Sequence, residues 1–132
     1  MLLALAEQQG IRSDVLPKIA TGFCSGFSRT AGTCGAVTGG VMGIGLALGR
    51  DDPTQSVEPC FTAVRLFLEH FEVEFGSLTC LGITGCHLGT PEGQVRFKNE
   101  NAITVCYRVA AGAARLAWGA VEEVRRVDNG AR

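Results

Sequence analysis

Apolar residues recur at three- and four-residue steps along much of the chain, which is the spacing of one face of an α-helix. The clearest run predicts a helix over about 57–75, with an apolar face formed by Phe61, Val64, Leu68, Phe71 and Phe75. A second run predicts a helix over about 102–126, with a face formed by Ile103, Cys106, Ala110, Ala113, Ala117, Ala120 and Val124. Faces of this kind are expected to pack against one another in a bundle.

A glycine-rich helix is predicted between Cys34 and Leu48, with Thr33 placed to cap its start and Gly49 following its end. It carries an apolar stripe at Val37, Val41, Ile44 and Leu48. It also carries a glycine stripe at Gly35, Gly39 and Gly43. Glycine inside a helix is about 1 kcal/mol less favourable than alanine, so the glycine stripe predicts the close approach of another helix or of a flat ligand.

Shorter elements fill the rest of the chain. Residues 2–9 and 15–21 suit short helices, and residues 77–81 suit a single helical turn. The Gly-rich stretches 23–32 and 87–93 are predicted to be loops. No segment alternates apolar and polar positions at period two. The predicted fold class is therefore all-α, a single compact helical bundle of four to five helices around the buried Gly-rich helix.

The two ends of the chain carry separate expectations. The sequence begins on apolar helix residues with no cap before them, so residues 1–12 are interpreted as the remainder of a longer first helix. Residues 127–132 are expected to form a frayed tail. A chain of 132 residues is the usual length of one domain, and one domain is expected here.

Composition and motifs exclude several classes of function. Hydrophobic residues make up 46% of the chain, which is enough for a packed core and excludes disorder. A formal net charge of -1 argues against a nucleic-acid partner. The stretch from Thr30 to Gly49 has no charge, but its glycines favour a buried helix, and no membrane span is expected. Hydrolase, kinase and dehydrogenase signatures are missing.

Six cysteines are the most unusual feature of the composition. The first apolar run ends at Ala6, before Glu7, and no basic residue precedes it, so no secretion signal is visible. We therefore interpret the cysteines as thiols of a cytoplasmic protein, used in redox chemistry, metal binding or packing. No C-x-x-C motif occurs, which argues against a thioredoxin-type dithiol, a zinc ribbon and covalent haem attachment.

Three cysteines have a chemical case for reactivity. Cys34 begins the Gly-rich helix, where unpaired N–H groups and the helix dipole favour a thiolate, although packing of a small buried side chain is the alternative. Cys80 and Cys86 flank two glycines that allow the chain to fold back. These two are predicted to be a dithiol pair or ligands of a metal or iron–sulfur cluster, with structural thiols as the alternative.

The remaining candidates are weaker. Cys106 is expected to point inward from the last helix, which suits either packing or function. Cys60 is expected to pack in the core, and Cys24 has no assigned role. His87 suits a metal ligand or proton relay, although an isolated loop histidine is more often neither. His70 is expected to be solvated.

The cysteine motifs resemble those of a known family. Residues 34–39 form a C-G-A-x-x-G motif, and the blocks EFGSLTC at 74–80 and GCHLGTPEG at 85–93 follow it in order, before Cys106 in the last helix. In this combination the chain resembles the C_GCAxxG_C_C family, small proteins described as redox-active from their cysteines. The likeness runs from about Leu2 to Val121.

The resemblance implies a role for particular cysteines. Cys34, Cys80 and Cys106 match the family cysteines, and Cys86 is a frequent companion in the family. Related helical domains occur in a cytochrome with haems at a dimer interface. The family usually has a further cysteine near the start of its first helix, and this sequence lacks it there. A four-thiolate site built from this chain alone therefore departs from the family pattern.

Three hypotheses of function remain open from the sequence. The first is a redox-active protein whose thiols form disulfides or bind a metal or iron–sulfur cluster, through Cys34, Cys80, Cys86 and Cys106. The second is a non-catalytic module that binds haem or another flat cofactor against Gly35, Gly39 and Gly43. The third is a structural dimeric domain with packing cysteines. The redox partner, the cofactor and the question of enzymatic activity stay undecided, and a homodimer is one alternative.

Overall fold

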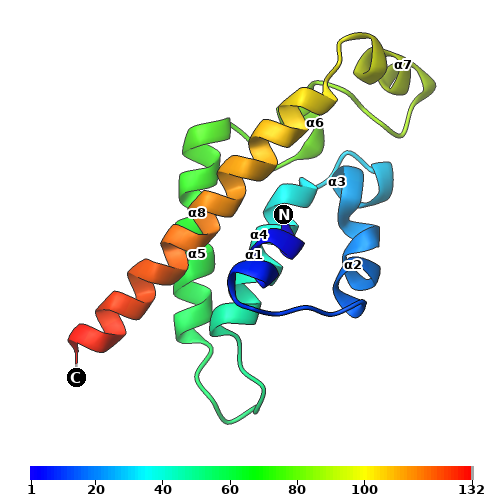
Figure 1. Ribbon diagram of the computed structural model, residues 1–132. Helices are drawn as coiled ribbons and strands as arrows, with labels where there is room; N and C mark the ends of the chain where they lie inside the picture. Colours follow the sequence, from blue (N-terminus) through cyan, green and yellow to red (C-terminus); the bar gives the residue numbers. More distant parts are fainter. Residues whose placement is uncertain (132) are drawn as a thin grey trace.

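The computed structural model describes residues 1–131, and those residues fold into helices without a β-strand (Figure 1). The elements are α1 (Leu2–Gln8), α2 (Val15–Ala20), a 3-10 turn (Thr21–Phe23), α3 (Cys24–Arg29), α4 (Gly35–Leu48), α5 (Glu58–Phe75), α6 (Cys80–Thr84), α7 (Pro91–Asn99) and α8 (Ile103–Gly130). The predicted all-α class is confirmed, and the helices are more numerous than the four to five expected. None of the helices within residues 1–131 is both long enough and apolar enough to cross a membrane.

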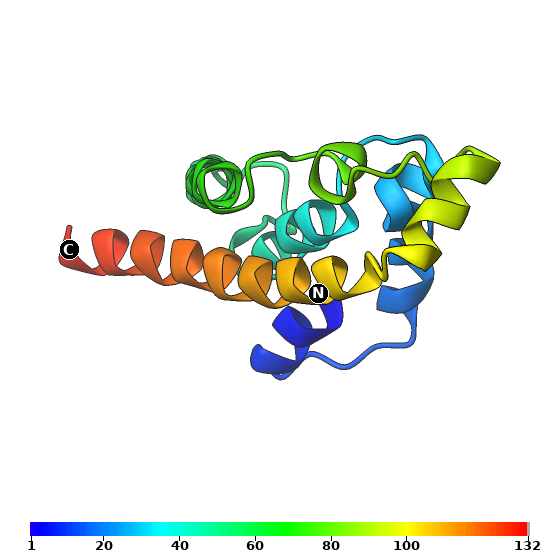
Figure 2. The same cartoon turned by 90° about the horizontal axis from the view of Figure 1, so that it is seen from above.

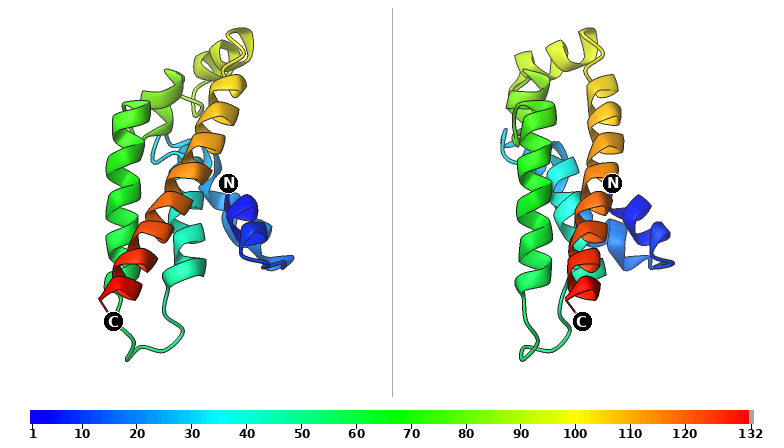
Figure 3. Two further views of the ribbon diagram at one scale, coloured as in Figure 1. Left: turned by 60° about the vertical axis from the view of Figure 1, so that its left-hand side comes forward. Right: turned by 90° about the vertical axis from the view of Figure 1, so that its left-hand side faces the viewer.

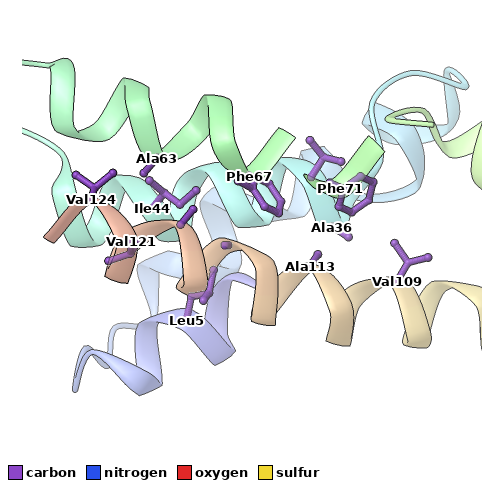
Figure 4. Packing of buried hydrophobic residues seen from close by; sticks show 13 residues of the cluster. Leu5, Ala36, Ile44, Ala63, Phe67, Phe71, Val109, Ala113, Val121 and Val124 are labelled. Carbon is purple, nitrogen blue, oxygen red and sulfur yellow. The ribbon is translucent and has the colours of Figure 1, made fainter. Parts of the chain in front are cut away.

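The main core lies where α4, α5 and α8 pack together, with α1 against α4. The two long helices, α5 and α8, pack against each other and cross at an angle (Figures 1 and 3). Phe67, Phe71 and Ile44 are fully buried in this core, and Figure 4 shows the side chains of α1, α4, α5 and α8 meeting there. Burial of each such side chain stabilises the fold by about 1.5–3 kcal/mol. The apolar periodicity of the three helices thus accounts for the body of the molecule.

The glycines of α4 are explained by close packing against other helices. A Cβ atom at Gly39 would lie 2.8 Å from Cγ of Met1, and one at Gly43 would overlap the Leu5 side chain. A Cβ atom at Gly40 would overlap the ring of Phe67. Of the two alternatives that the glycine stripe left open, a neighbouring helix is the one found at these positions: α1 lies on Gly39 and Gly43.

The N-terminal elements form an arm beside the long helices. Leu2, Ala6 and Leu16 make a small second cluster, against which Met42 of α4 packs. The cluster joins α1 to α2, and the chain then continues into α3; α2 and α3 lie to one side of α4 and α8 (Figure 2). The arm formed by these N-terminal helices therefore lies beside the bundle near the start of α4.

Segment 24–29 is a compact turn of left-handed backbone rather than the predicted loop. Non-glycine residues disfavour this conformation by about 1–2 kcal/mol each. Side-chain hydrogen bonds hold the turn, from Oγ of Ser28 to the Gly22 carbonyl at 2.9 Å and from Oγ1 of Thr30 to the Gly26 carbonyl at 3.0 Å. The positive φ angles, between 52° and 63°, occur at Ser25, Gly26, Phe27 and Ser28.

The second half of the chain differs from prediction at three places. The helical turn expected at 77–81 is displaced to 80–84 and ends at Gly85, whose φ is 68°. The loop expected at 87–93 gives way to α7 from Pro91, where Oγ1 of Thr90 accepts a hydrogen bond from the Gly93 N–H at 3.0 Å. Helix α8 extends past Arg126 to Gly130, so the predicted frayed tail is helical up to that residue. Arg132 lies outside the described residues.

Candidate functional site

Cys34 and Cys80 are brought together by a short backbone pairing. Thr33 and Thr79 form an isolated antiparallel β-bridge. On either side of it, the Cys34 N–H donates to the Leu78 carbonyl and the Cys80 N–H donates to the Gly32 carbonyl, both at 2.8 Å. Main-chain hydrogen bonds therefore determine where both cysteines lie, although they are far apart in sequence.

The pairing also sets the directions of the two side chains. Successive residues of extended chain point to opposite faces, so Cys34 and Cys80, each one residue after a bridge threonine, share a face. They are diagonal neighbours, a relation that places Cα atoms about 7–8 Å apart and lets longer side chains meet. Disulfides join Cα atoms that lie closer than this, so a disulfide between Cys34 and Cys80 would require movement of the backbone.

Each of these cysteines begins a helix. Cys34 is the N-cap of α4, and its carbonyl accepts the Val37 N–H at 2.9 Å. Cys80 is the first residue of α6, whose N-cap is Thr79, with Oγ1 accepting the Gly82 N–H at 3.0 Å. The sequence placed Cys34 at this helix start, but the predicted cap, Thr33, lies in the bridge one residue before it. The bridge adds the neighbour that the sequence did not reveal.

Cys106 supplies a third thiol from α8. Burial raises the pKa of Cys106, and repulsion from Cys34, then Cys80, then Cys86 raises it further. Burial likewise raises the pKa of Cys80, with Cys34 the next largest cause and Cys86 a smaller one. Among the neighbouring thiols, Cys34 therefore raises the pKa of Cys80 and the pKa of Cys106 the most. Together the three form the thiol cluster: Cys34, Cys80 and Cys106.

The left-handed turn covers one side of the thiol cluster. Gly26 is buried, and a Cβ atom there would lie 2.6 Å from Cβ of Cys80 and 2.8 Å from the Gly32 carbonyl. Gly26 also accepts the Gly32 N–H at 3.1 Å through its own carbonyl. The turn therefore packs directly on Cys80 and on the bridge that positions it.

An apolar pocket of about 780 Å³ opens beside the thiol cluster, and Cys34, Cys80 and Cys106 all line it. Volumes of this size are typical of sites for small organic ligands. The exposed Cys24 lies at its edge, and Arg29 supplies the single charged side chain of its lining. The apolar lining includes Leu2, Leu16, Phe23, Met42, Leu88, Phe97 and Ile103.

The other predicted cysteines and histidines lie outside this pocket. Cys86 is 1% exposed, and its Sγ–H donates to the Thr84 carbonyl at 3.4 Å. Cys60 packs against the core, as expected, and burial raises its pKa. His87 is exposed, with Nδ1 accepting the Gly89 N–H at 3.1 Å, and His70 is exposed on α5.

The glycines predicted to bind a cofactor divide between two settings. Gly35 and Gly39 line the pocket, whereas Gly43 does not. A Cβ atom at Gly35 would lie 3.2 Å from the Phe23 carbonyl oxygen and 3.5 Å from Cα of Cys24. The stripe as a whole therefore does not present one flat surface to a ligand.

The four predicted metal ligands do not form a metal site as they stand. Within residues 1–131, no three Cys, His, Asp or Glu side chains are grouped so that they could hold a metal ion. In the same part of the chain all six cysteines are free thiols. The arrangement offers clustered thiols next to an apolar space rather than a ready coordination sphere.

Sequence reasoning missed two members of the site. Cys24 and Arg29 belong to the left-handed turn, which brings both to the pocket edge. Consecutive left-handed residues have no sequence signature apart from glycine, and Gly26 is the only glycine among residues 24–29. The pairing of segments 32–34 and 78–80 was also hidden, because two short stretches leave no periodic pattern.

Comparison with known proteins adds one finding. The family model described as "Putative redox-active protein (C_GCAxxG_C_C)" matches residues 1–118. The chain belongs to the C_GCAxxG_C_C family. Curated proteins and solved structures gave no match. Membership in the C_GCAxxG_C_C family agrees with the resemblance inferred from Cys34, Cys80 and Cys106, and the family description assigns no role to individual cysteines.

Proposed function

We propose that the protein carries redox equivalents by cycling between a dithiol and a disulfide at the thiol cluster, with Cys34 as the central sulfur and Cys80 as its first partner. The observation that carries this proposal is the pairing around the Thr33–Thr79 bridge, which sets both cysteines on one face. Family membership supports redox activity in general.

The pKa shifts identify the neighbours of each thiol. Burial, and then repulsion from Cys34, raises the pKa of Cys80 and of Cys106, so ionising the whole thiol cluster at once is unfavourable. Exchange is therefore expected to proceed through one thiolate at a time. Cys34 is a more important neighbour of Cys80 than Cys86 is, which favours a Cys34–Cys80 disulfide over the Cys80–Cys86 pair suggested by sequence.

The oxidation is ordinary thiol–disulfide exchange. The Cys34 thiolate attacks an external disulfide, whose S–S bond breaks and releases one external thiolate. The Cys80 thiolate then attacks the Cys34 sulfur, forms the internal disulfide and releases the second external thiolate. Two electrons pass to the external disulfide, and the two protons of the cysteines end on the released thiols. Cys106 is placed to exchange with either sulfur.

The test is to oxidise the reduced protein, without oxygen, with a small aromatic disulfide, then count thiols and map disulfides by mass spectrometry. We expect two thiols to be lost per chain in a Cys34–Cys80 disulfide, and much slower thiol loss in Cys34→Ser, whose thiol cluster keeps only Cys80 and Cys106. Cys60→Ser is the matched control, because Cys60 is half-buried in the core, away from the pocket, and should leave the disulfide intact.

Two outcomes would refute the proposal. One is a protein whose Cys34 and Cys80 stay reduced while other cysteines oxidise. The other is stoichiometric iron or zinc on protein purified without oxygen, lost in Cys34→Ser but kept in Cys60→Ser, which would establish the metal-ligand alternative.

A further inference from the structure

The pocket beside the thiol cluster has a lining that restricts what can enter it. Most of its wall is hydrocarbon, and Arg29 is the only charged side chain in it. No carboxylate within residues 1–131 forms an ion pair with Arg29. A ligand with one or two oxygen acceptors fits such a wall, because a single guanidinium can bind them.

Four polar side chains of the wall already donate to nearby carbonyls, whereas Ser25, Tyr107 and Arg29 line it without such a bond among the described residues. Burying a charged or strongly polar molecule here would remove its hydration without replacing it, at a free-energy cost of several kcal/mol. A multiply charged peptide disulfide is therefore a poor occupant. The donors engaged in this way are Oγ1 of Thr21 to Pro17, Oγ1 of Thr38 to Gly35, Oγ1 of Thr84 to Cys80 and Nε2 of Gln94 to Leu88.

The buried position of the thiols points to the same kind of molecule. Cys80 is 7% exposed and is covered by Gly26, so the pocket is the direct route to its sulfur. An oxidant that reaches Cys34 and Cys80 together must be apolar, small enough for about 780 Å³, and able to take two electrons.

We infer that the pocket binds an apolar quinone, which accepts two electrons from the thiol cluster, with Arg29 donating to a quinone oxygen. This inference rests on the dithiol/disulfide function proposed above. One S–S bond forms between Cys34 and Cys80 as two S–H bonds break. Two electrons and two protons pass to the quinone, whose two carbonyl oxygens become the hydroxyls of the hydroquinone. Positive charge at Arg29 stabilises the negative charge that develops on the nearer oxygen.

The experiment uses 2,3-dimethyl-1,4-naphthoquinone, whose methyl groups block addition of thiols to the ring. Reduced protein is mixed with it without oxygen, and hydroquinone formation is followed by absorbance. We expect one hydroquinone for each Cys34–Cys80 disulfide formed. Ala110→Leu should slow this reaction about tenfold or more, because the larger side chain occupies space that the quinone needs.

Matched variants separate the pocket from the thiols. Ala111→Leu lies next along α8 on an exposed position outside the pocket lining and should leave the quinone rate unchanged. The small aromatic disulfide used above, when it is supplied in saturating excess, should still oxidise Ala110→Leu. Arg29→Gln should slow the quinone reaction more than the disulfide reaction, whereas the exposed Arg12→Gln should change neither.

Three results would overturn the inference while leaving the dithiol function standing. The first is normal oxidation by the aromatic disulfide with no hydroquinone formed. The second is equal quinone rates in Ala110→Leu and Ala111→Leu. The third is faster oxidation by cumene hydroperoxide than by the quinone with the same sensitivity to Ala110→Leu, which would assign an organic peroxide to the pocket. Loss of the disulfide with both oxidants would instead refute the proposed function itself.

Discussion

At the scale of single residues, the surroundings of each thiol differ more than the sequence suggests. Cys34 and Cys80 are held by main-chain hydrogen bonds, Cys86 donates to Thr84, and Cys60 is packed in the core. Burial raises the pKa of both Cys106 and Cys60, but neighbouring thiols raise only that of Cys106 further, so the two can be told apart.

We predict that Cys34→Ser lowers the pKa of Cys80 and of Cys106 and leaves that of Cys60 unchanged, because only the first two are repelled by Cys34. The measurement is the pH profile of alkylation at each cysteine, by mass spectrometry, in the folded and the urea-unfolded chain. In the folded wild-type chain the profiles of Cys80 and Cys106 should lie above the ordinary thiol pKa of 9.0.

The raised pKa values of Cys80 and Cys106 also predict how the stability of the protein changes with pH. Below pH 9 these thiols are protonated in both states and contribute no pH dependence. As pH rises further, the unfolded chain ionises first, so the free energy of unfolding should fall until the folded-state pKa is passed.

For the alkylation experiment, a Cys106 profile that is the same in wild type and Cys34→Ser would show that the sulfurs of Cys34 and Cys106 are too far apart to interact.

At the scale of elements, α4 is the helix whose close packing leaves the least room for added side-chain atoms. Its glycines let α1 and the Phe67 ring approach to contact, whereas a Cβ atom at Gly45 on the same helix would have no neighbour within 4 Å. The same residue type therefore has opposite consequences at positions two residues apart.

We predict that Gly43→Ala destabilises the protein by about 1–3 kcal/mol, because the new methyl group would overlap Leu5 and push α1 from α4. Gly45→Ala should stabilise it by up to about 1 kcal/mol, because alanine favours the helix and meets no neighbour. Urea denaturation monitored by circular dichroism gives both values. Equal effects of the two substitutions would contradict the close approach of α1.

The elements also show how far the sequence could be interpreted. The long helices were predictable because Val64, Phe71 and Phe75 repeat at helical spacing. The predicted face was rotated in part, since Phe61 is exposed and Phe67, which was not assigned to the face, is fully buried. Helix α7 was missed because Gly89 and Gly93 suggested a loop, although Thr90 and Pro91 form a good cap and first turn. The bridge and the left-handed turn depend on contacts between distant segments, which a local pattern does not encode.

At the scale of the whole molecule, the site lies where the N-terminal arm meets the bundle. The pocket is lined by residues of α1, α2, α3, α4, α6, α7 and α8, so its shape depends on how the arm docks (Figures 1 and 2). A covalent link between Cys34 and Cys80 would tie the start of α4 to the start of α6 and so restrict the unfolded chain.

We predict that oxidation to the Cys34–Cys80 disulfide raises the free energy of unfolding by about 2–4 kcal/mol, as expected for a closed loop of about 45 residues. The measurement compares urea denaturation of oxidised and reduced protein. Cys60→Ser should keep the full gain and Cys80→Ser should lose it. An oxidised protein that is less stable than the reduced one would mean that the disulfide distorts the bridge.

The Thr33–Thr79 bridge has one more consequence, which concerns the spacing of the chain. Because amide and carbonyl groups hold the two cysteines, the identities of the threonine side chains matter little to the register. Length matters greatly, since inserting a single residue into either paired segment reverses which side of the ribbon each following side chain occupies. Relatives that preserve this chemistry should therefore tolerate varied residues at position 33 and other helix-capping residues at position 79, where the side chain caps α6, but no insertion or deletion between either position and its cysteine.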